Sequence, residues 1–511
     1  MQYRALGAKR LYPLTLVQAL RYGWCLLVVW AERVVFYQAA ASCGRTVPRA
    51  DDAIDIVIIA DPQVIGRGTY SYAWPLYRLA RLVSDVYLSK AWLTISGRGV
   101  GSQLFSRKWR TDFVVFLGDM SDRGRWSHEK PEWRALQRRW ERIYQGTEIV
   151  RNAITLGRRS GGHIPALLVP GNHDIGLPRQ DGAPQEAYAD AHAFFRERYG
   201  MHTNASRVLS DSGALSHNAR IPLSTDGESR THELVLINAL DLVGMEPIGT
   251  QFDEAGWETA RSHAPDTTAM LGAVSADVAS VRRVPRILFS HVPLSRGLDE
   301  LSCDVPWRTA RHGMRRESQR ARVRGGAILQ GGGIDKTYQN LVLPRTSNWV
   351  LDSVQPAVVF SGDDHDHCET IHRGIRKAAS VDGGVHGFAQ TDTPELTVKS
   401  ISMLEGVRRP GYARLRLYGP RSDGVPSLDY EPCVLPDQMA LWLYVYLPCF
   451  VLTIAFMVFW RMHRLPLLPS STNDTRPSAR QMRTGGTLIF RDIIAAGTAP
   501  ILLWGCFQLL G

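Results

Sequence analysis

Short motifs rich in Asp, Asn and His recur along this chain, each directly after a short apolar run of strand character. The apolar runs are 54–60, 113–117, 166–169, 286–289 and 357–360. The motifs that follow them are Asp61-Pro62-Gln63, Gly118-Asp119, Gly171-Asn172-His173-Asp174, Ser290-His291 and Asp364-His365-Asp366-His367. Loops at strand ends are where open α/β sheets place their chemistry. Since these side chains suit Mn, Zn or Fe, the series predicts a dinuclear metal site.

Two cations about 3.5–4 Å apart act on a phosphoryl group when one carboxylate is shared between them. Asp119 is the predicted shared ligand, because it lies in the tight turn after an apolar strand. The other predicted ligands are Asp61 and His367 for the first metal, and Asn172, His291 and His365 for the second.

His173 follows Asn172 directly and is not needed as a ligand. It is therefore predicted to be the general acid that donates a proton to the leaving oxygen, with Asp174 as the candidate to orient it. Each motif alone has a simpler explanation, since Gly-Asp and Asp-Pro are usually turns. A lone His291 would be a core histidine, and 363–367 a surface acidic loop. Their occurrence together and in this order favours the metal site.

The composition is that of a chain with a packed core and a basic surface. Of the 511 residues, 44% are hydrophobic and 21% charged, and the formal net charge is +11. No basic–aromatic motif stands out, so we expect no nucleic-acid partner. Much of the positive excess flanks apolar segments, where the positive-inside rule explains it.

Three segments are candidates for membrane helices. Residues 440–460 carry no charge and are long enough to cross a bilayer. Residues 493–510 are a second apolar candidate, with Pro500 inside it. Residues 11–41 are mostly apolar but include Arg21, Glu32 and Arg33. This last segment is either a signal anchor, which its length favours, or a signal peptide cleaved near Ala41.

Arginines predict how the chain is oriented in the membrane. The loop between the last two apolar segments contains Arg461, Arg464, Arg476, Arg480, Arg483 and Arg491. This loop and the basic N-terminus are expected in the cytosol, which places the metal motifs in the lumen. We therefore expect an N-terminal anchor at 1–45, a luminal domain at 46–432 and two C-terminal membrane helices at 433–511.

Seven cysteines are scattered along the chain without a CxxC pair, which argues against a zinc ribbon. Cys25, Cys449 and Cys506 fall in apolar segments. Cys303 and Cys368 lie near metal motifs. These two are either a disulfide in an oxidising lumen or two separate buried thiols.

Taken together, the motifs resemble those of the calcineurin-like metallophosphoesterase superfamily. The pattern of that superfamily is Asp-x-His, Gly-Asp, Gly-Asn-His-Asp/Glu, a lone His and Gly-His-x-His. The resemblance implies an α/β (α+β) fold, a two-sheet β-sandwich flanked by helices, and it implies the same ligand and acid roles for the matching residues. Two departures are visible. Gln63 stands where the family usually has His, and Asp364 replaces the Gly before the final His-x-His. Gln63 would bind a soft metal less well, which favours Mn²⁺ over Zn²⁺. The expected cofactors are two divalent ions, Mn²⁺ first, with Zn²⁺ or Fe as the alternatives.

A narrower resemblance is to the membrane metallophosphoesterases that remodel GPI anchors, of the yeast cell-division-control and mammalian post-attachment types. It rests on the first four motifs and on the stretches 360–369 and 397–402. It implies hydrolysis of an ethanolamine-phosphate side branch on a mannose of the GPI glycan, in the ER or early Golgi. The substrate partners would be the GPI lipid or GPI-anchored proteins at a bilayer. The alternatives are another phospholipid or phospho-sugar substrate, or a non-catalytic trafficking adaptor for GPI-anchored cargo.

Overall fold

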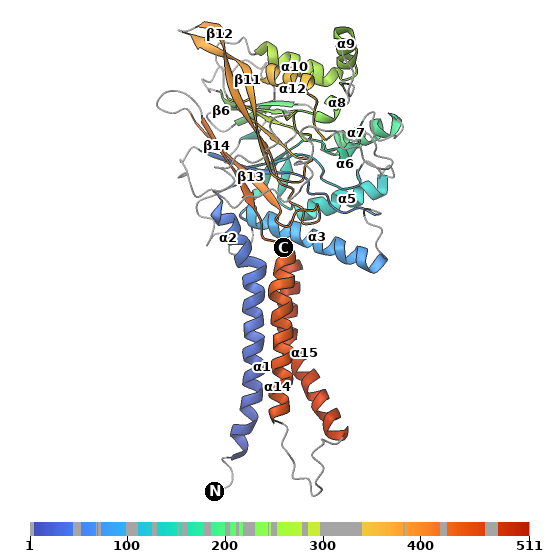
Figure 1. Ribbon diagram of the computed structural model, residues 1–511, viewed down its shortest axis with the longest axis vertical. Coiled ribbons are helices and arrows are strands. Elements are labelled where there is room, and N and C mark those ends of the chain that lie inside the picture. The colour runs from blue at the N-terminus through green and yellow to red at the C-terminus, as the bar shows by residue number, and fades with distance from the viewer. Residues whose placement is uncertain are drawn as a thin grey trace. The chain divides into compact units, whose positions relative to one another are not determined.

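The chain forms two compact units, one mainly helical and one that contains the β-sheets (Figure 1). The helical unit comprises Met1–Gln38 and Pro436–Gly511, and the sheet unit comprises Ala39–Leu435, wider than the predicted 46–432. The computed structural model describes residues 5–43, 53–67, 69, 73–98, 111–124, 130–150, 154–155, 162–177, 185–199, 205–210, 214–217, 230–243, 245–246, 253–277, 285–296, 340–381, 384–419, 427–464 and 479–509.

The first sheet has the strand order β14-β13-β1-β2-β5-β3. Its strands are β1 (Ile54–Ile59), β2 (Phe113–Phe116), β3 (Thr147–Ile149), β5 (Ile164–Leu168), β13 (Gly411–Tyr418) and β14 (Ser427–Val434). Neighbours among β1, β2, β5 and β3 are parallel, and β13 pairs antiparallel with β1. β2 is wholly buried, which explains its continuous apolar sequence. Asp55, the one charged residue of β1, accepts a 2.6 Å hydrogen bond from Nε of Arg416.

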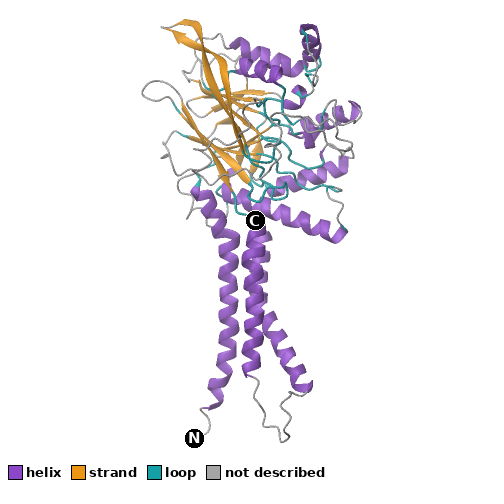
Figure 2. Ribbon diagram, in the orientation of Figure 1, coloured by secondary structure: helices purple, strands orange, loops and turns teal. Residues whose placement is uncertain are grey.

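The second sheet has the order β11-β12-β10-β9-β8-β6-β7-β4. Its strands are β4 (Ile154–Thr155), β6 (Ala205–Ser210), β7 (Ala214–His217), β8 (Arg230–Leu236), β9 (Arg286–Phe289), β10 (Val358–Ser361), β11 (Cys368–Val381) and β12 (Gly384–Thr397). Its centre, β8-β9-β10-β12, is parallel, and β11 returns antiparallel along β12. The predicted two-sheet α/β architecture is confirmed, with helices flanking the strands (Figure 2).

Helices of the sheet unit pack on the strands through aromatic side chains. On the first sheet, Trp92 of α3 and Trp140 of α5 both contact Phe116 of β2, with ring centroids 6.5 and 5.1 Å away. Burial of such rings is the main source of stability in a core of this kind. The described helices are α3 (Trp74–Ile95), α5 (Lys130–Ile143), α6 (Asn172–Ile175), α7 (Gln185–Tyr199), α8 (Ala239–Leu242), α9 (Glu254–Ser262), α10 (Pro265–Asp277) and α12 (Pro344–Val354).

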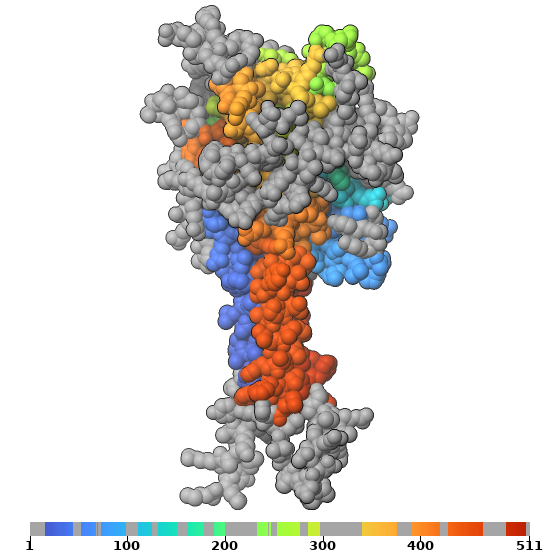
Figure 3. All heavy atoms as spheres, viewed as in Figure 1, coloured from blue at the N-terminus to red at the C-terminus, as the bar shows by residue number. Residues whose placement is uncertain are grey.

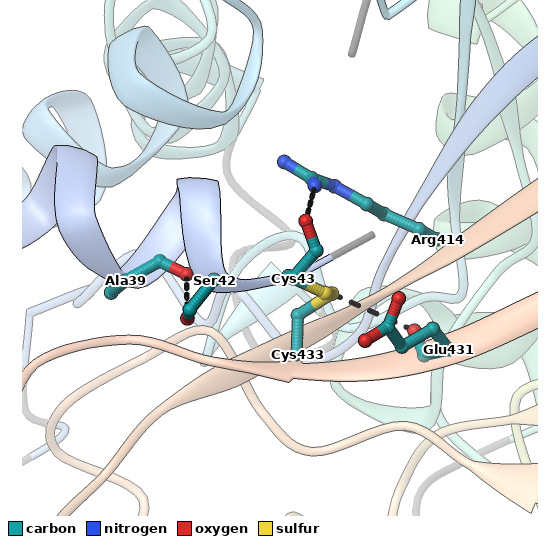
Figure 4. The surroundings of a disulfide bond; sticks show 6 residues. All are labelled: Ala39, Ser42, Cys43, Arg414, Glu431 and Cys433. Carbon is teal, nitrogen blue, oxygen red and sulfur yellow. Dashed lines mark hydrogen bonds between the residues drawn. A yellow bond between two sulfur atoms is a disulfide. The ribbon is translucent and has the colours of Figure 1, made fainter. Parts of the chain in front are cut away.

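A disulfide between Cys43 and Cys433 joins the two ends of the sheet unit (Figure 4). Nη1 of Arg414 in β13 donates a 2.6 Å hydrogen bond to the carbonyl oxygen of Cys43, which holds the same segment. The sequence did not indicate this pairing, because the two cysteines are 390 residues apart. Cys368 is also disulfide-bonded, whereas Cys303, its expected candidate partner, lies outside the described residues.

Among the residues that the structure describes, three helices are long and apolar enough to cross a membrane. These stretches are Leu16–Ser42, Gln438–Met462 and Thr487–Cys506, close to the three predicted segments. The first stretch is built from α1 (Ala5–Val29), the π-helical turn η1 (Trp30–Val34) and α2 (Val35–Ser42). The second is built from α13 (Gln438–Ala440), the π-helical turn η4 (Leu441–Tyr446) and α14 (Leu447–Arg464), and the third lies in α15 (Ala479–Leu509).

Polar contacts join these helices to one another. The hydroxyl of Tyr446 donates a 3.0 Å hydrogen bond to Glu32, which is buried. Trp24 stacks on Tyr446, and its Nε1 donates to Oγ1 of Thr453 at 3.1 Å. Ionisable groups at membrane depth are tolerated when they face other helices and are hydrogen-bonded. This pairing explains how the first apolar segment accommodates Glu32.

Candidate metal centre

Strand ends from both sheets supply the metal-binding motifs. In the first sheet, Asp61, Asp119 and Asn172 follow the adjacent parallel strands β1, β2 and β5. In the second, His291 and Asp363 follow the adjacent parallel strands β9 and β10. The carboxyl ends of parallel neighbours meet at one edge of a sheet. The site therefore lies where these edges of the two sheets come together.

Asp61, Asp119 and His291 form the centre of the site. One ligand atom from each lies within 4.8 Å of the other two, and all three side chains are fully buried. Nε2 of His291 is 3.3 Å from Oδ1 of Asp119, and its Nδ1 is 3.8 Å from Oδ1 of Asp61. The predicted ligands from three separate motifs are thus brought together.

The backbone around the site is held in an uncommon conformation. Left-handed φ values of 42° to 61° occur at Asp61, Gln63, Asp119, Asp363 and His365. Such values are rare for residues other than glycine and cluster at functional sites. Here they turn successive side chains of short loops toward one centre.

Two glycines allow the loops to approach one another. Gly118 has a φ of 99°, and a Cβ there would lie 2.6 Å from Nδ1 of His291. A Cβ on Gly171 would lie only 2.1 Å from Oδ1 of Asp119. The Gly-Asp and Gly-Asn-His-Asp motifs therefore need their glycines because the two loops touch.

The third motif presents Asn172 and His173 to different neighbours. Oδ1 of Asn172 is 2.9 Å from Nε2 of His291, inside the cluster. The backbone N–H of His173 donates to Oδ1 of Asp119 at 2.9 Å. Its side chain is 25% exposed, and its Nε2 lies 4.0 Å from Oδ2 of Asp119. His173 is thus adjacent to the cluster and accessible from outside it.

Asp122, which the sequence interpretation overlooked, contacts the imidazole of His173. Nδ1 of His173 is 2.6 Å from the carbonyl oxygen of Asp122 and 3.3 Å from its carboxylate. Burial raises the pKa of Asp122, but the hydrogen bond and charge of His173 outweigh it and lower that pKa. An ionised Asp122 stabilises a protonated His173, as a proton donor requires.

The contacts described for Asp174, the residue expected to orient His173, are to backbone N–H groups. Its carboxylate accepts hydrogen bonds from the backbone N–H groups of Gly171 at 3.0 Å, Ser121 at 3.2 Å and Met120 at 3.3 Å. Burial and the neighbouring charge of Asp119 raise its pKa to about 7. Asp174 therefore fastens the third motif to the turn after Asp119.

The last motif enters the site two residues earlier than expected. The backbone N–H of Asp363 donates to Asp61 at 3.2 Å, and its carboxylate lies 3.5 Å from Nε2 of His291. The preceding residue, Gly362, also lies close to the cluster, because a Cβ there would be 3.4 Å from Oδ2 of Asp61. The amide of Gln63 lies 3.1 Å from Oδ2 of Asp119 and 2.8 Å from Nε2 of His365.

His367, expected as a ligand, has its described contacts elsewhere. Its backbone N–H donates to Asp366 at 2.8 Å, and its Nε2 lies 3.9 Å from Glu369. In the pattern Gly-His-x-His, Gly362 therefore aligns Asp363 with the first His and His365 with the second. The sequence interpretation instead aligned the two histidines of 365–367 with the two histidines of the pattern. The glycine that directly follows β10, Gly362, was the signal for the correct alignment.

Charged residues outside the centre fix this motif. Arg296 donates from Nη1 to Asp364 at 2.9 Å and from Nη2 to Oγ1 of Thr397 at 3.0 Å. Nζ of Lys399 is 3.3 Å from Asp366. Nδ1 of His365 is 3.5 Å from Glu405, an arrangement that orients metal-binding histidines. No local sequence pattern predicted these partners.

The electrostatics and the donor set fit divalent cations. Burial alone lowers the pKa of His291, but the carboxylates of Asp119, Asp363 and Asp61 outweigh it and raise the pKa to about 10. Burial raises the pKa of Asp61, whose Oδ2 has no hydrogen-bond partner among the described residues. A buried, orphaned carboxylate oxygen within a negative cluster is what a bound cation satisfies.

The fold and this site define a class of protein. The family model for the calcineurin-like phosphoesterases matches residues 54–367, and the chain belongs to that family. It is therefore a metal-dependent phosphoesterase.

Individual proteins are similar to this chain at lower identity. It is 25% identical to Cell division control protein 1 of Saccharomyces cerevisiae over 463 residues. That alignment covers 86% of this chain and 73% of the yeast protein. A purple acid phosphatase from yellow lupin matches at 10% identity and a TM-score of 0.29, over 77% of this chain and 56% of that one. A 5′-nucleotidase precursor from Thermus thermophilus matches at 10% identity and a TM-score of 0.26, over 79% and 60%. The match spans less than two thirds of either solved chain.

Gly171→Ala is predicted to remove metal without unfolding the protein. The added Cβ would overlap Asp119, so the ligand must shift, whereas the buried strands are untouched. Metal content by mass spectrometry should fall while the far-ultraviolet circular dichroism is retained. Gly272→Ala is the control, because a Cβ there meets nothing within 4 Å on α10. Full metal content in Gly171→Ala would contradict the contact.

Proposed function

We propose that this protein is a luminal, Mn²⁺-dependent phosphodiesterase that removes the ethanolamine-phosphate side branch from a mannose of GPI anchors. The observation that carries the proposal is the placement of His173, partly exposed, beside the buried cluster of Asp61, Asp119 and His291. Cleavage of a phosphodiester with a poor leaving group requires a proton donor next to a two-metal site.

In the proposed ligand assignment, Asp119 would be shared between the two cations. Asp61 and His365 would hold the first cation, with the amide of Gln63 beside them. The second would be held by the remaining members of the cluster, Asn172, His291 and Asp363. This replaces the expected His367 by Asp363. The additional oxygen donor and Gln63 make the set harder, which favours Mn²⁺ over Zn²⁺.

When bound, the two cations neutralise charge on the phosphoryl group and activate the attacking water. The chain's own residues supply orientation and the proton. Asp122 holds Nδ1 of His173, so Nε2 is the nitrogen that delivers a proton to the sugar oxygen as the bond to phosphorus breaks. Glu405 orients the ring of His365 through Nδ1, the ring nitrogen that does not face Gln63.

Two observations support a luminal sheet unit. Disulfides persist in oxidising compartments such as the ER lumen, and Cys43–Cys433 lies within this unit. The loop between the last two membrane helices is rich in arginine, as expected of a cytosolic loop. The GPI substrate class follows from the resemblance of the motifs to the GPI-remodelling group, and similarity to the yeast protein over most of the chain supports it.

Analysis of GPI glycans by mass spectrometry tests the substrate. Cells that lack the protein should accumulate GPI anchors bearing the extra ethanolamine phosphate, and the intact chain should remove them. Asp119→Asn should fail to do so, because it loses the shared carboxylate charge. Rescue by Asp119→Asn would identify an adaptor, and an unchanged glycan profile would indicate another phosphodiester substrate.

Asp363→Ala is predicted to lower the metal content from two equivalents toward one, since it deletes a carboxylate that faces His291. His367→Gln is the matched comparison from the same motif and should keep both equivalents. Elemental analysis of the dialysed, folded variants measures this. The opposite result, with loss only in His367→Gln, would restore the ligand set expected from the sequence.

His173→Asn is predicted to lose activity selectively while both metals remain bound. Loss of a positioned proton donor costs about 10²–10⁴-fold in rate when the leaving group is a sugar alkoxide. An aryl phosphodiester, whose leaving group needs no proton, should be cleaved nearly as well as before. His263→Asn, on the exposed end of α9, is the control. Equal losses on both substrates, together with metal loss, would make His173 a ligand.

A further inference from the structure

The helix α3 has two halves with opposite environments. Its C-terminal half packs on the first sheet, with Leu88 and Trp92 fully buried. Between Trp74 and Val83, in contrast, no side chain is buried. Large apolar side chains in this half are mostly exposed: Trp74 64%, Leu76 58%, Leu79 56% and Leu82 57%. Figure 3 shows part of α3, in light blue, at the surface of the sheet unit. One exposed leucine is ordinary, but several on one helical segment mark an interaction surface.

The exposed leucines share one side of the helix. At about 100° per residue, Leu76, Leu79 and Leu82 fall within about a third of a turn. Further along, α3 is buried on both sides, with Leu93 on the leucine side and Trp92 on the other. The leucine face is therefore uncovered only in the N-terminal half of α3.

The rest of this segment is aromatic and basic. The guanidinium of Arg78 lies 4.1 Å from the ring centroid of Trp74, and that of Arg81 lies 5.8 Å from the ring of Tyr77. Within α3 no Asp or Glu occurs before Asp85, and Asp85 is ion-paired with Arg139 at 2.6 Å. The segment thus combines a leucine face with a positively charged aromatic face, the composition of helices that lie in a membrane interface.

Covalent connections bring the sheet unit to a bilayer. This unit runs from Ala39 to Leu435, and the candidate membrane stretches end at Ser42 and begin again at Gln438. Cys43–Cys433 ties the two connections to each other. A unit with two such short tethers is held at the lipid surface, which raises the effective concentration of lipid at its exposed apolar face.

We propose that residues 74–83 of α3, here called the interfacial segment, lie in the surface of the bilayer. The leucine face enters the boundary between headgroups and acyl chains, and Arg78 and Arg81 contact the phosphates of anionic lipids. This surface goes beyond the proposed hydrolysis and does not depend on which phosphodiester is cut.

The interfacial segment is mechanically connected to the metal centre. Arg139 of α5 donates from Nε to Asp85 of α3 at 2.9 Å and from Nη1 to the carbonyl oxygen of Ile65 at 2.5 Å. Ile65 belongs to the loop that begins with Asp61 and Gln63. Docking of the segment on lipid therefore orients the metal loop with respect to the membrane surface.

Depth-dependent quenching in nanodiscs tests this surface on the full-length chain. Leu79→Cys is labelled with an environment-sensitive fluorophore, after Cys25, Cys449 and Cys506 have been replaced by Ser. The nanodiscs contain phosphatidylcholine and phosphatidylserine, with or without doxyl-labelled lipid. We expect several-fold stronger quenching by the doxyl lipid at Leu79→Cys than at His263→Cys, an exposed control on α9.

Arg78→Gln together with Arg81→Gln should weaken the quenching at Leu79→Cys, and omission of phosphatidylserine should have the same effect. Both results support the lipid surface. Equal, weak quenching at Leu79→Cys and His263→Cys would overturn the proposal. Fluorophore self-quenching at Leu79→Cys that requires two chains per nanodisc, without quenching by doxyl lipid, would assign the leucine face to a second copy instead.

Discussion

Repulsion among three buried carboxylates is the constraint around which the site is organised. Asp61 and Asp119 are fully buried, and Asp363 joins them around the ring of His291. Like charges so placed in a low-dielectric interior repel strongly, and only bound cations or protons offset that repulsion. The raised pKa of His291 is the response of the protein alone to this field. The left-handed loop residues and the close approach of Gly171 to Asp119 exist to bring these charges together.

The acidic run after β10 shows that neighbouring residues of one type have different uses. Asp363 faces the cluster, Asp364 pairs with Arg296, and Asp366 lies beside Lys399. The two basic side chains, Arg296 and Lys399, come from the loop after β9 and the segment after β12. Two distant stretches of chain therefore hold this acidic motif in place. Asp364 and Asp366 thus each have an opposite charge beside them, which limits their desolvation penalty. Asp363, in contrast, adds its negative charge to the metal centre.

The end of the chain completes the first sheet and continues into the second candidate membrane stretch. β13 pairs with β1, β14 pairs with β13, and Cys433 in β14 is bonded to Cys43. The strand that precedes Asp61 is therefore braced by the strands that lead to the second membrane helix.

The sequence by itself determined the family, the two-sheet architecture, the apolar spans and most of the cluster. Strand-end motifs are local, and Asp61, Asp119, Asn172 and His291 each follow an apolar run that must be buried. The tertiary structure decided what depends on contacts between distant segments. It selected Asp363 where the pair His365 and His367 suggested a later alignment of the motif, brought Asp122 rather than Asp174 to the ring of His173, and paired cysteines 390 residues apart. Residue type and spacing specify which groups can bind or react, but only the packing of loops from two sheets fixes which of them meet.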